Sequence, residues 1–326
     1  MNKYIRNKTP LPAAIFPLLL LFSSAGDASS LNLSYGQLAK HVSYQDQTLS
    51  MDPAGPGLAL SLDLNEQFTV DFSYHEWEDD SDILNRSAVD AELQTWGTRI
   101  SYYRDNWAFS LHYYDFEDDT FVASIANPDR RYRHDVTESS YFGGSVGYAW
   151  SSNRMFYSVS FGAQIGDWDN KVTQLQDRPP PAPAPRRGPP PPPTIETEAT
   201  NGDSSSLGAS VSLARYWPLT ENTGVLVGSL FSWNHMLSGE SSLVSRNGQA
   251  NSPPSNGPGP QGNQNAAVSG FTGDIGSVSG GDSYGQLSLY ASLNIIPSWS
   301  IDFDTGFYIG TDDSDQFWSV NVAYFF

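Results

Sequence analysis

The strongest hint of enzymatic chemistry in this sequence is the tripeptide His41-Val42-Ser43. Residues two apart on a β-strand point to the same face, and a base must lie beside the nucleophile that it activates. Such a pair also needs a third group that orients the histidine. Gln316, beside the closing C-terminal strand, is the only outward-facing candidate, and its amide is a poor substitute for a carboxylate. We therefore assign no catalytic residue and keep His41 and Ser43 as candidates.

Charged residues on the polar face of the predicted strands form a second set of candidates. They are Asp63, Asp71, Arg99, His112, Asp302 and Asp304. Asp71 and Arg99 fall at one height on adjacent strands, which predicts a cross-strand ion pair that braces the sheet. The same face, with its Ser and Gly residues, could instead line an acidic passage that favours cations or polar neutral solutes. The two interpretations are compatible.

Acidic clusters follow several of the predicted strands. They comprise Glu76, Glu78, Asp79, Asp80 and Asp82; Asp115, Glu117, Asp118 and Asp119; and Asp312, Asp313 and Asp315. Carboxylate oxygens suit Ca²⁺ or Mg²⁺, but the sequence has no twelve-residue calcium-binding loop. It also has no Cys, which excludes thiolate metal sites and disulfides. We assign no metal ligand and predict no cofactor.

The elements that position these residues are strands, and the clearest is the C-terminal stretch FWSVNVAYFF at 317–326. One face of this strand carries Trp318, Val320, Val322, Tyr324 and Phe326. Similar period-two alternation predicts about twelve strands. Their expected ranges are 31–44, 57–64, 68–77, 93–103, 107–116, 139–150, 155–168, 206–217, 224–234, 284–295, 299–310 and 317–326. Short and long connections alternate between them.

A terminal Phe at the end of an aromatic-rich alternating strand resembles the assembly signal of bacterial outer-membrane β-barrels. The resemblance implies an all-β fold, an antiparallel transmembrane barrel with short periplasmic turns and long extracellular loops. It also implies the outer membrane of a Gram-negative bacterium, with its lipids, lipopolysaccharide and barrel-assembly machinery as partners. A soluble β-sandwich would alternate too, but its outer faces are rich in Lys, Thr and Glu and its turns lack this asymmetry.

Residues 1–28 are predicted to be a secretory signal peptide, and residues 29–326 the barrel. Lys3, Arg6 and Lys8 precede a short apolar run, and cleavage after Ala25 or after Ala28 is consistent with the small residues there. The run is too short to span a membrane. Two predicted extracellular loops have low complexity: residues 170–205, with a polyproline spacer at 178–193, and residues 245–283, which are rich in Gly, Asn, Ser and Pro.

The formal net charge of −19 argues against nucleic acid as a partner, since binding to nucleic acid needs a basic face. Removing Lys3, Arg6, Lys8 and Asp27 with the signal takes away a net +2 and leaves −21. Aromatic residues are abundant while hydrophobic residues reach only 39%. This composition fits a barrel with one apolar face toward lipid and one polar face toward its lumen.

The sequence therefore predicts a pore or facilitator for passive diffusion of small polar or cationic solutes. Twelve strands lie between barrels whose interior is filled and barrels with an open channel, so loops that plug the pore remain an open alternative. Another alternative is a lipid hydrolase, because His41-Val42-Ser43 resembles the His-x-Ser of outer-membrane phospholipase and lipid A deacylase barrels. The residues that follow lack the Asn or Glu of the phospholipase pattern. The third is a structural or adhesive surface barrel. The solute and the oligomeric state stay open.

Overall fold

The computed structural model describes residues 29–38, 40–44, 47–79, 87–124, 132–176, 194–220, 223–238, 240–241, 278–279, 283–296, 298–309 and 316–326. The expected signal peptide, the polyproline spacer and most of the loop at 245–283 lie outside these residues. So do Asp80, Asp82, Asp312, Asp313 and Asp315. The described part of the chain contains no helix that could cross a membrane.

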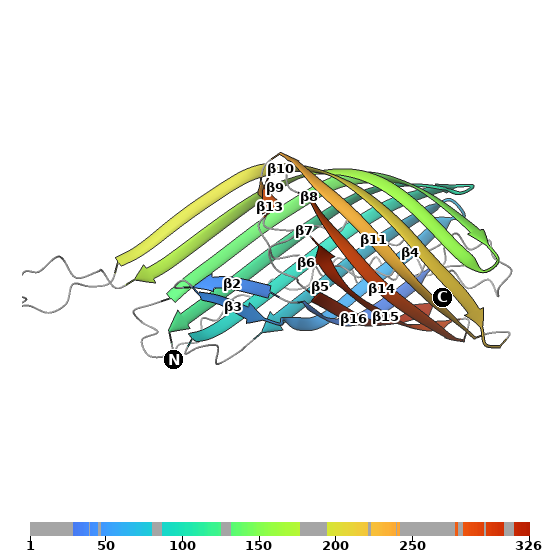
Figure 1. Ribbon diagram of the computed structural model, residues 1–326, viewed down its shortest axis with the longest axis horizontal. Helices are drawn as coiled ribbons and strands as arrows, with labels where there is room; N and C mark the ends of the chain where they lie inside the picture. The colour runs from blue at the N-terminus through green and yellow to red at the C-terminus, as the bar shows by residue number, and fades with distance from the viewer. Residues whose placement is uncertain are drawn as a thin grey trace, which may run out of the picture.

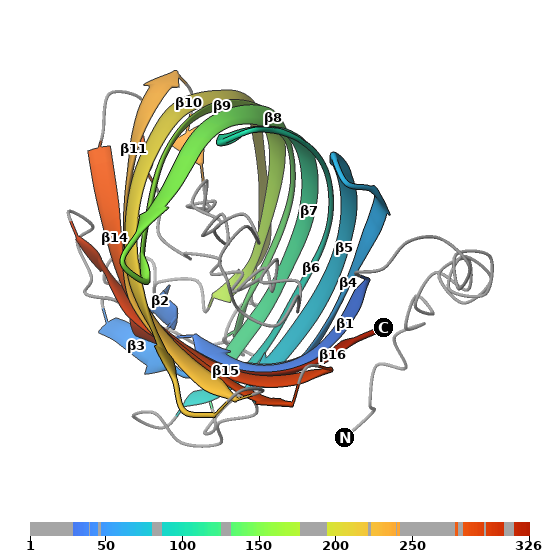
Figure 2. The same cartoon turned by 90° about the vertical axis from the view of Figure 1, so that its right-hand side faces the viewer.

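Twelve antiparallel strands close into one barrel, in the order β1-β16-β15-β14-β11-β10-β9-β8-β7-β6-β5-β4 (Figures 1 and 2). The strands are β1 (Ser30–Leu38), β4 (Ala54–Asn65), β5 (Phe68–Asp79), β6 (Ser87–Arg104), β7 (Trp107–Ser124), β8 (Tyr132–Ser152), β9 (Met155–Gln176), β10 (Thr194–Pro218), β11 (Gly224–Ser238), β14 (Ser283–Ile296), β15 (Trp299–Ile309) and β16 (Gln316–Phe325). The predicted fold class and strand number are confirmed.

Two small two-stranded sheets are separate from the barrel sheet. One pairs β2 (Lys40–Tyr44) with β3 (Gln47–Met51), and the other pairs β12 (Glu240–Ser241) with β13 (Val278–Ser279). A single strand over 31–44 is therefore wrong, because the wall strand β1 ends at Leu38 and the chain turns into a separate hairpin. The expected loop over 45–56 likewise contains β3 and the start of β4.

Tight turns join the strands at one end of the barrel, called here the short-turn end. Asn153 and Arg154 both have positive φ, 51° and 66°, as the central residues of a type I′ hairpin turn require. The barrel also closes at this end, where the backbones of Ser29 and Phe326 exchange hydrogen bonds of 2.9 and 3.2 Å. The opposite end, where the long connections leave the wall, is called the long-loop end.

Several strands extend further toward the long-loop end than the sequence predicted. β8 begins at Tyr132 rather than near 139, β9 continues to Gln176 rather than 168, and β10 begins at Thr194 rather than near 206. The β9–β10 ladder alone runs from Thr194↔Gln176 to Arg215↔Met155. In Figure 1 these strands form the protruding ribbons at one end. The expected loops over 117–138 and 169–205 are wrong to that extent.

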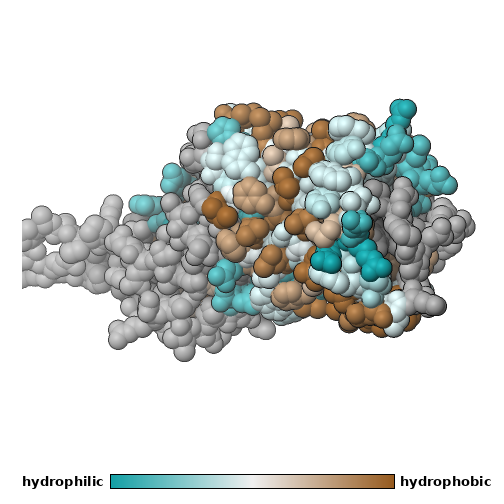
Figure 3. Space-filling view, turned by 45° about the vertical axis from the view of Figure 1, so that its right-hand side comes forward, coloured by the Kyte–Doolittle hydropathy of each residue, from teal (hydrophilic) through white to brown (hydrophobic). Residues whose placement is uncertain are grey.

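The outer surface of the wall is apolar, with aromatic side chains near the short-turn end. Phe161 and Ile165 are each 62% exposed, and Figure 3 shows brown, hydrophobic residues across the wall. Trp150 stacks on Tyr157, with ring centroids 5.3 Å apart, and Trp299 lies 4.9 Å from Tyr324. Amphipathic rings of this kind suit a membrane–water interface.

The inner surface of the wall is polar over much of its length. Ser158 and Ser160 on β9 hydrogen-bond Ser212 and Ser210 on β10, each with an Oγ–Oγ distance of 2.6 Å. These two hydroxyl pairs satisfy one another across β9 and β10.

Candidate functional site: the lumen wall

The predicted ion pair between Asp71 and Arg99 is present on the inner wall. The two residues are cross-strand partners on β5 and β6. Arg99 donates from Nε at 2.8 Å and from Nη2 at 2.7 Å to the same Oδ2 of Asp71. The side chains are only 11% and 15% exposed, so the pair lies largely out of solvent. The ion pair therefore joins β5 and β6 near the short-turn end of the barrel.

A small pocket opens on the wall beside this ion pair. Its lining comes from β1, β4, β5, β6 and β7 and consists of Asn32, Ala59, Leu60, Ser61, Asp71, Phe72, Ser73, Gly97, Thr98, Arg99 and Tyr114. The polar atoms of Asn32, Ser61 and Ser73 belong to inward-facing residues. The pocket therefore combines both signs of charge with neutral hydrogen-bonding groups.

His112 lies next to Arg99 in the strand register and is 8% exposed. Its ring centroid is 5.3 Å from that of Tyr114, and its Nε2 has no hydrogen-bond partner. Gly143 stands opposite on β8, where an added Cβ would come within 2.5 Å of the His112 Nε2. The glycine thus makes the space in which the imidazole lies.

Asp63 occupies the inner wall at the short-turn end of β4. Its Oδ1 accepts a hydrogen bond of 2.6 Å from the hydroxyl of Thr69, its cross-strand partner on β5. The carboxylate is therefore part of the polar wall where the short turns meet the lumen.

Asp302 and Asp304 lie two residues apart on the inner face of β15 and are 4% and 0% exposed. Their cross-strand partners on β16 are Asn321 and Ser319. Ser300 donates a hydrogen bond of 3.2 Å to the Oδ2 of Asp302. These are the two most deeply buried carboxylates among the predicted lumen residues.

The sequence did not predict an apolar cluster on the inner wall toward the long-loop end. Its members come from β3, from β5 to β8 and from β11, β14 and β16: Met51, Trp77, Val89, Ala91, Leu93, Phe116, Val122, Tyr141, Met236, Tyr284 and Phe317. Ala91 and Leu93 are completely buried. On β5 to β7 the inner wall thus changes from polar near the short-turn end to apolar beyond it. On β9, β10 and β14 a second apolar cluster of Phe156, Ala214 and Tyr290 lies near the short-turn end. The alternating residues Val89, Ala91 and Leu93 of β6 could have predicted an inward apolar face. Residues 78–92 were instead expected to be a loop.

The candidate pair His41 and Ser43 lies on β2, in the hairpin that is separate from the barrel wall. In this hairpin His41 is the partner of Ser50, and Ser43 is the partner of Thr48. Gln316, the candidate third group, begins β16 of the wall. The predicted strand 31–44 placed the pair on the first barrel strand, and that placement is wrong because the wall strand β1 ends at Leu38.

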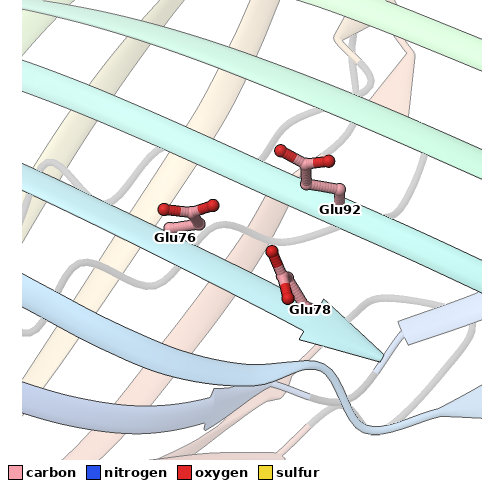
Figure 4. Close-up of side chains that lie close together, drawn as sticks. All are labelled: Glu76, Glu78 and Glu92. Atoms are coloured by element: carbon pink, nitrogen blue, oxygen red, sulfur yellow. The ribbon is translucent and has the colours of Figure 1, made fainter. Parts of the chain in front are cut away.

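Acidic side chains gather on the outer surface toward the long-loop end. Carboxylate oxygens of Glu76, Glu78 and Glu92 lie within 4.8 Å of one another on β5 and β6 (Figure 4). Glu76 accepts a hydrogen bond of 3.1 Å from Tyr74, and Glu92 accepts one of 2.5 Å from Gln94. These glutamates follow the aromatic pair Trp96 and Tyr113, whose rings are 5.2 Å apart, so polar surface replaces apolar surface at this height.

The predicted assembly residues form one outward row on β16. Trp318, Val320, Val322, Tyr324 and Phe326 are each between 36% and 47% exposed. Trp318 also donates a hydrogen bond of 2.7 Å to Gln37 on β1, across the line where the barrel closes.

No protein-family model and no curated protein matches this chain. Solved structures do match. The translocator domain of the autotransporter NalP from Neisseria meningitidis superposes with a TM-score of 0.53 at 10% identity, covering 96% of this chain and 94% of that one. The β domain of the Bordetella autotransporter BrkA gives 0.51 at 9% identity, covering 92% and 99%. Both likenesses concern the fold. The chain therefore has the twelve-stranded antiparallel fold of bacterial outer-membrane β-barrel proteins.

Proposed function

We propose that the protein is an outer-membrane facilitator through which small polar or cationic solutes diffuse passively. The observation that carries this proposal is the inner wall near the short-turn end, where hydroxyl side chains accompany the partly exposed carboxylates of Asp63 and Asp71. Acidic side chains that line a pore favour cations. Arg99 neutralises Asp71, so the accessible negative charge on this part of the wall belongs mainly to Asp63.

The apolar cluster sets how easily a solute passes. A hydrophobic constriction excludes water and so limits conduction. Trp77, Leu93 and Phe116 approach the lumen from β5, β6 and β7, while Phe317 and Tyr284 approach from β16 and β14. We accordingly propose a narrow pathway with a polar, acidic section and an apolar constriction, which suits small solutes and low conductance.

The test is the current carried by the refolded full chain in planar bilayers, measured with different salts on the two sides. The proposal expects a small cation-selective conductance. Asp63→Asn should lower the selectivity for cations because it removes one accessible lumen charge with little change in side-chain volume. Glu76→Gln, on the outer surface, is the control and should leave the selectivity unchanged. An anion-selective current, or equal selectivity in Asp63→Asn and the wild type, would refute an acidic pathway.

We also propose that residues 1–28 direct export to the outer membrane and are removed. Sequencing the N-terminus of the protein isolated from outer membranes tests this. The expected first residue is Gly26 or Ser29, and a mature chain that retains Met1 would contradict the proposal.

A further inference from the structure

We propose that Asp302 anchors a binding site for a hard divalent cation, with Ca²⁺ as the probe, on the inner wall formed by β14, β15 and β16. The proposal goes beyond the facilitator function, because a resident cation requires no open pathway. It rests on the state of one carboxylate and on the oxygen atoms that the strand register places around it.

The carboxylate of Asp302 is buried and only half satisfied. The residue is 4% exposed, and its Oδ2 accepts a hydrogen bond of 3.2 Å from Ser300. Its Oδ1 has no hydrogen-bond partner. Asp302 also makes no ion pair with any Lys, Arg or His of the chain that the structure describes.

Three other aspartates on the barrel each lie beside a basic side chain. Asp71 is paired with Arg99, Asp135 with Arg133, and Asp119 with His134, at 2.7 to 2.8 Å. All three pairs are more exposed than Asp302. A buried carboxylate without a counter-ion is unfavourable, so the more deeply buried group is the one that most needs a counter-ion.

A proton and a cation are the two ways to neutralise this carboxylate. A proton on Oδ2 could be donated to the Ser300 hydroxyl, but it would leave Oδ1 a carbonyl oxygen without a donor. A cation would neutralise the charge and also take the lone pairs of Oδ1. Direct measurement of Ca²⁺ binding distinguishes the two.

The strand register supplies further oxygen atoms at the same height. Asn321 is the cross-strand partner of Asp302 on β16 and is 5% exposed, and Ser292 is its partner on β14. The Asn321 Nδ2 has no hydrogen-bond partner. The two ends of an amide are assigned from their surroundings, so the oxygen of Asn321 can take the position that Nδ2 has here.

The next row up the wall adds two more oxygen-bearing side chains. Asp304 lies two residues from Asp302 on the same inward face, and Ser319 is its partner on β16 with a hydroxyl that has no hydrogen-bond partner. Carboxylate, amide and hydroxyl oxygens, without nitrogen or sulfur, select hard cations. Ca²⁺ tolerates irregular oxygen geometry and completes its shell with water, which makes it the appropriate probe.

The test uses the refolded full chain in detergent micelles after treatment with EDTA. Calorimetry measures Ca²⁺ binding, and thermal unfolding is recorded with and without Ca²⁺. The wild type should bind Ca²⁺ and unfold at a higher temperature when Ca²⁺ is present. Asp302→Asn keeps the volume of the side chain and removes its charge. Its affinity for Ca²⁺ should fall at least about tenfold, since affinity follows the charge of the ligands, and its unfolding temperature should no longer respond to Ca²⁺.

A triple variant on the outer surface, Glu76→Gln with Glu78→Gln and Glu92→Gln, is the control for the other carboxylate cluster. It should keep the wild-type response. Asn321→Asp provides a second variant should Asp302→Asn fail to refold: the added carboxylate should tighten Ca²⁺ binding. No Ca²⁺ binding by the wild type, loss of binding in the triple variant, or unchanged affinity in both lumen variants would overturn the proposal. All of these measurements detect Ca²⁺ binding and not ion conduction. They therefore test the site even if the barrel conducts no current.

Discussion

The ring of Tyr114 on β7 lies over Gly97, its cross-strand partner on β6, on the inner wall of the barrel. A Cβ added at Gly97 would overlap the ring atoms of Tyr114 and stand 3.2 Å from the Ser73 hydroxyl. The same arrangement recurs at Tyr141 and Gly166, and at Tyr290 and Gly228. An aromatic ring that covers a strand glycine protects its backbone and fixes the register of the two strands.

Gly97→Ala should therefore destabilise the barrel by about 1–3 kcal/mol, because the Tyr114 ring must leave its position. Urea unfolding in lipid vesicles, followed by tryptophan fluorescence, measures the change. Gly285→Ala is the control: its nearest neighbour would be 3.3 Å from the new Cβ, at the movable ring of Phe231. Equal stability of the two variants would contradict this role for Tyr114.

Asp71→Asn should cost about 3 kcal/mol of unfolding free energy, because it leaves the largely buried guanidinium of Arg99 without its counter-ion. Replacing both residues, with Asp71→Asn and Arg99→Gln, should cost less than the sum of the single changes, since neither charge is then left alone. Urea midpoints of the four proteins complete the double-mutant cycle. Strictly additive effects would mean that the ion pair does not brace the wall.

Phe326→Ala should reduce the amount of folded barrel in the outer membrane, if the outward row on β16 is the assembly signal. The Phe326 side chain is 47% exposed, so its loss removes little packing within the barrel. Immunodetection of the protein in outer-membrane fractions measures the effect. Phe325→Ala, on the opposite face of the same strand, is the control. Normal levels of the Phe326→Ala protein would contradict the assembly role.

The wall strands were predictable wherever one face meets lipid. Trp107, Phe109 and Leu111 alternate with Ala108, Ser110 and His112, and the start of β7 is where this alternation begins. Asp71 and Arg99 could be paired from sequence because each lies a countable distance from a short turn. The number of residues from the turn gives the height of a residue on its strand, and its odd or even position gives the face of the sheet on which its side chain lies.

The extensions of the strands could not be predicted in this way. Residues 194–204 of β10 read TIETEATNGDS, with polar residues on both faces. Beyond the apolar outer band of the barrel, toward the long-loop end, neither face of a strand contacts lipid. Apolar and polar residues therefore no longer alternate there, although the strands still pair through their backbones. The apolar cluster was missed for another reason: Val89 and Ala91 alternate with Asp90 and Glu92, but they lie on an extension that was expected to be a loop.

The most direct test of the facilitator function compares the single-channel conductance of the wild type with that of Leu93→Ser. Leu93 is completely buried within the apolar cluster. Serine is smaller and polar, so it should let water into the constriction. The account predicts a small cation-selective current for the wild type and a larger one for Leu93→Ser, with the selectivity retained. Silence from both proteins, when circular dichroism shows that both are folded, would contradict it.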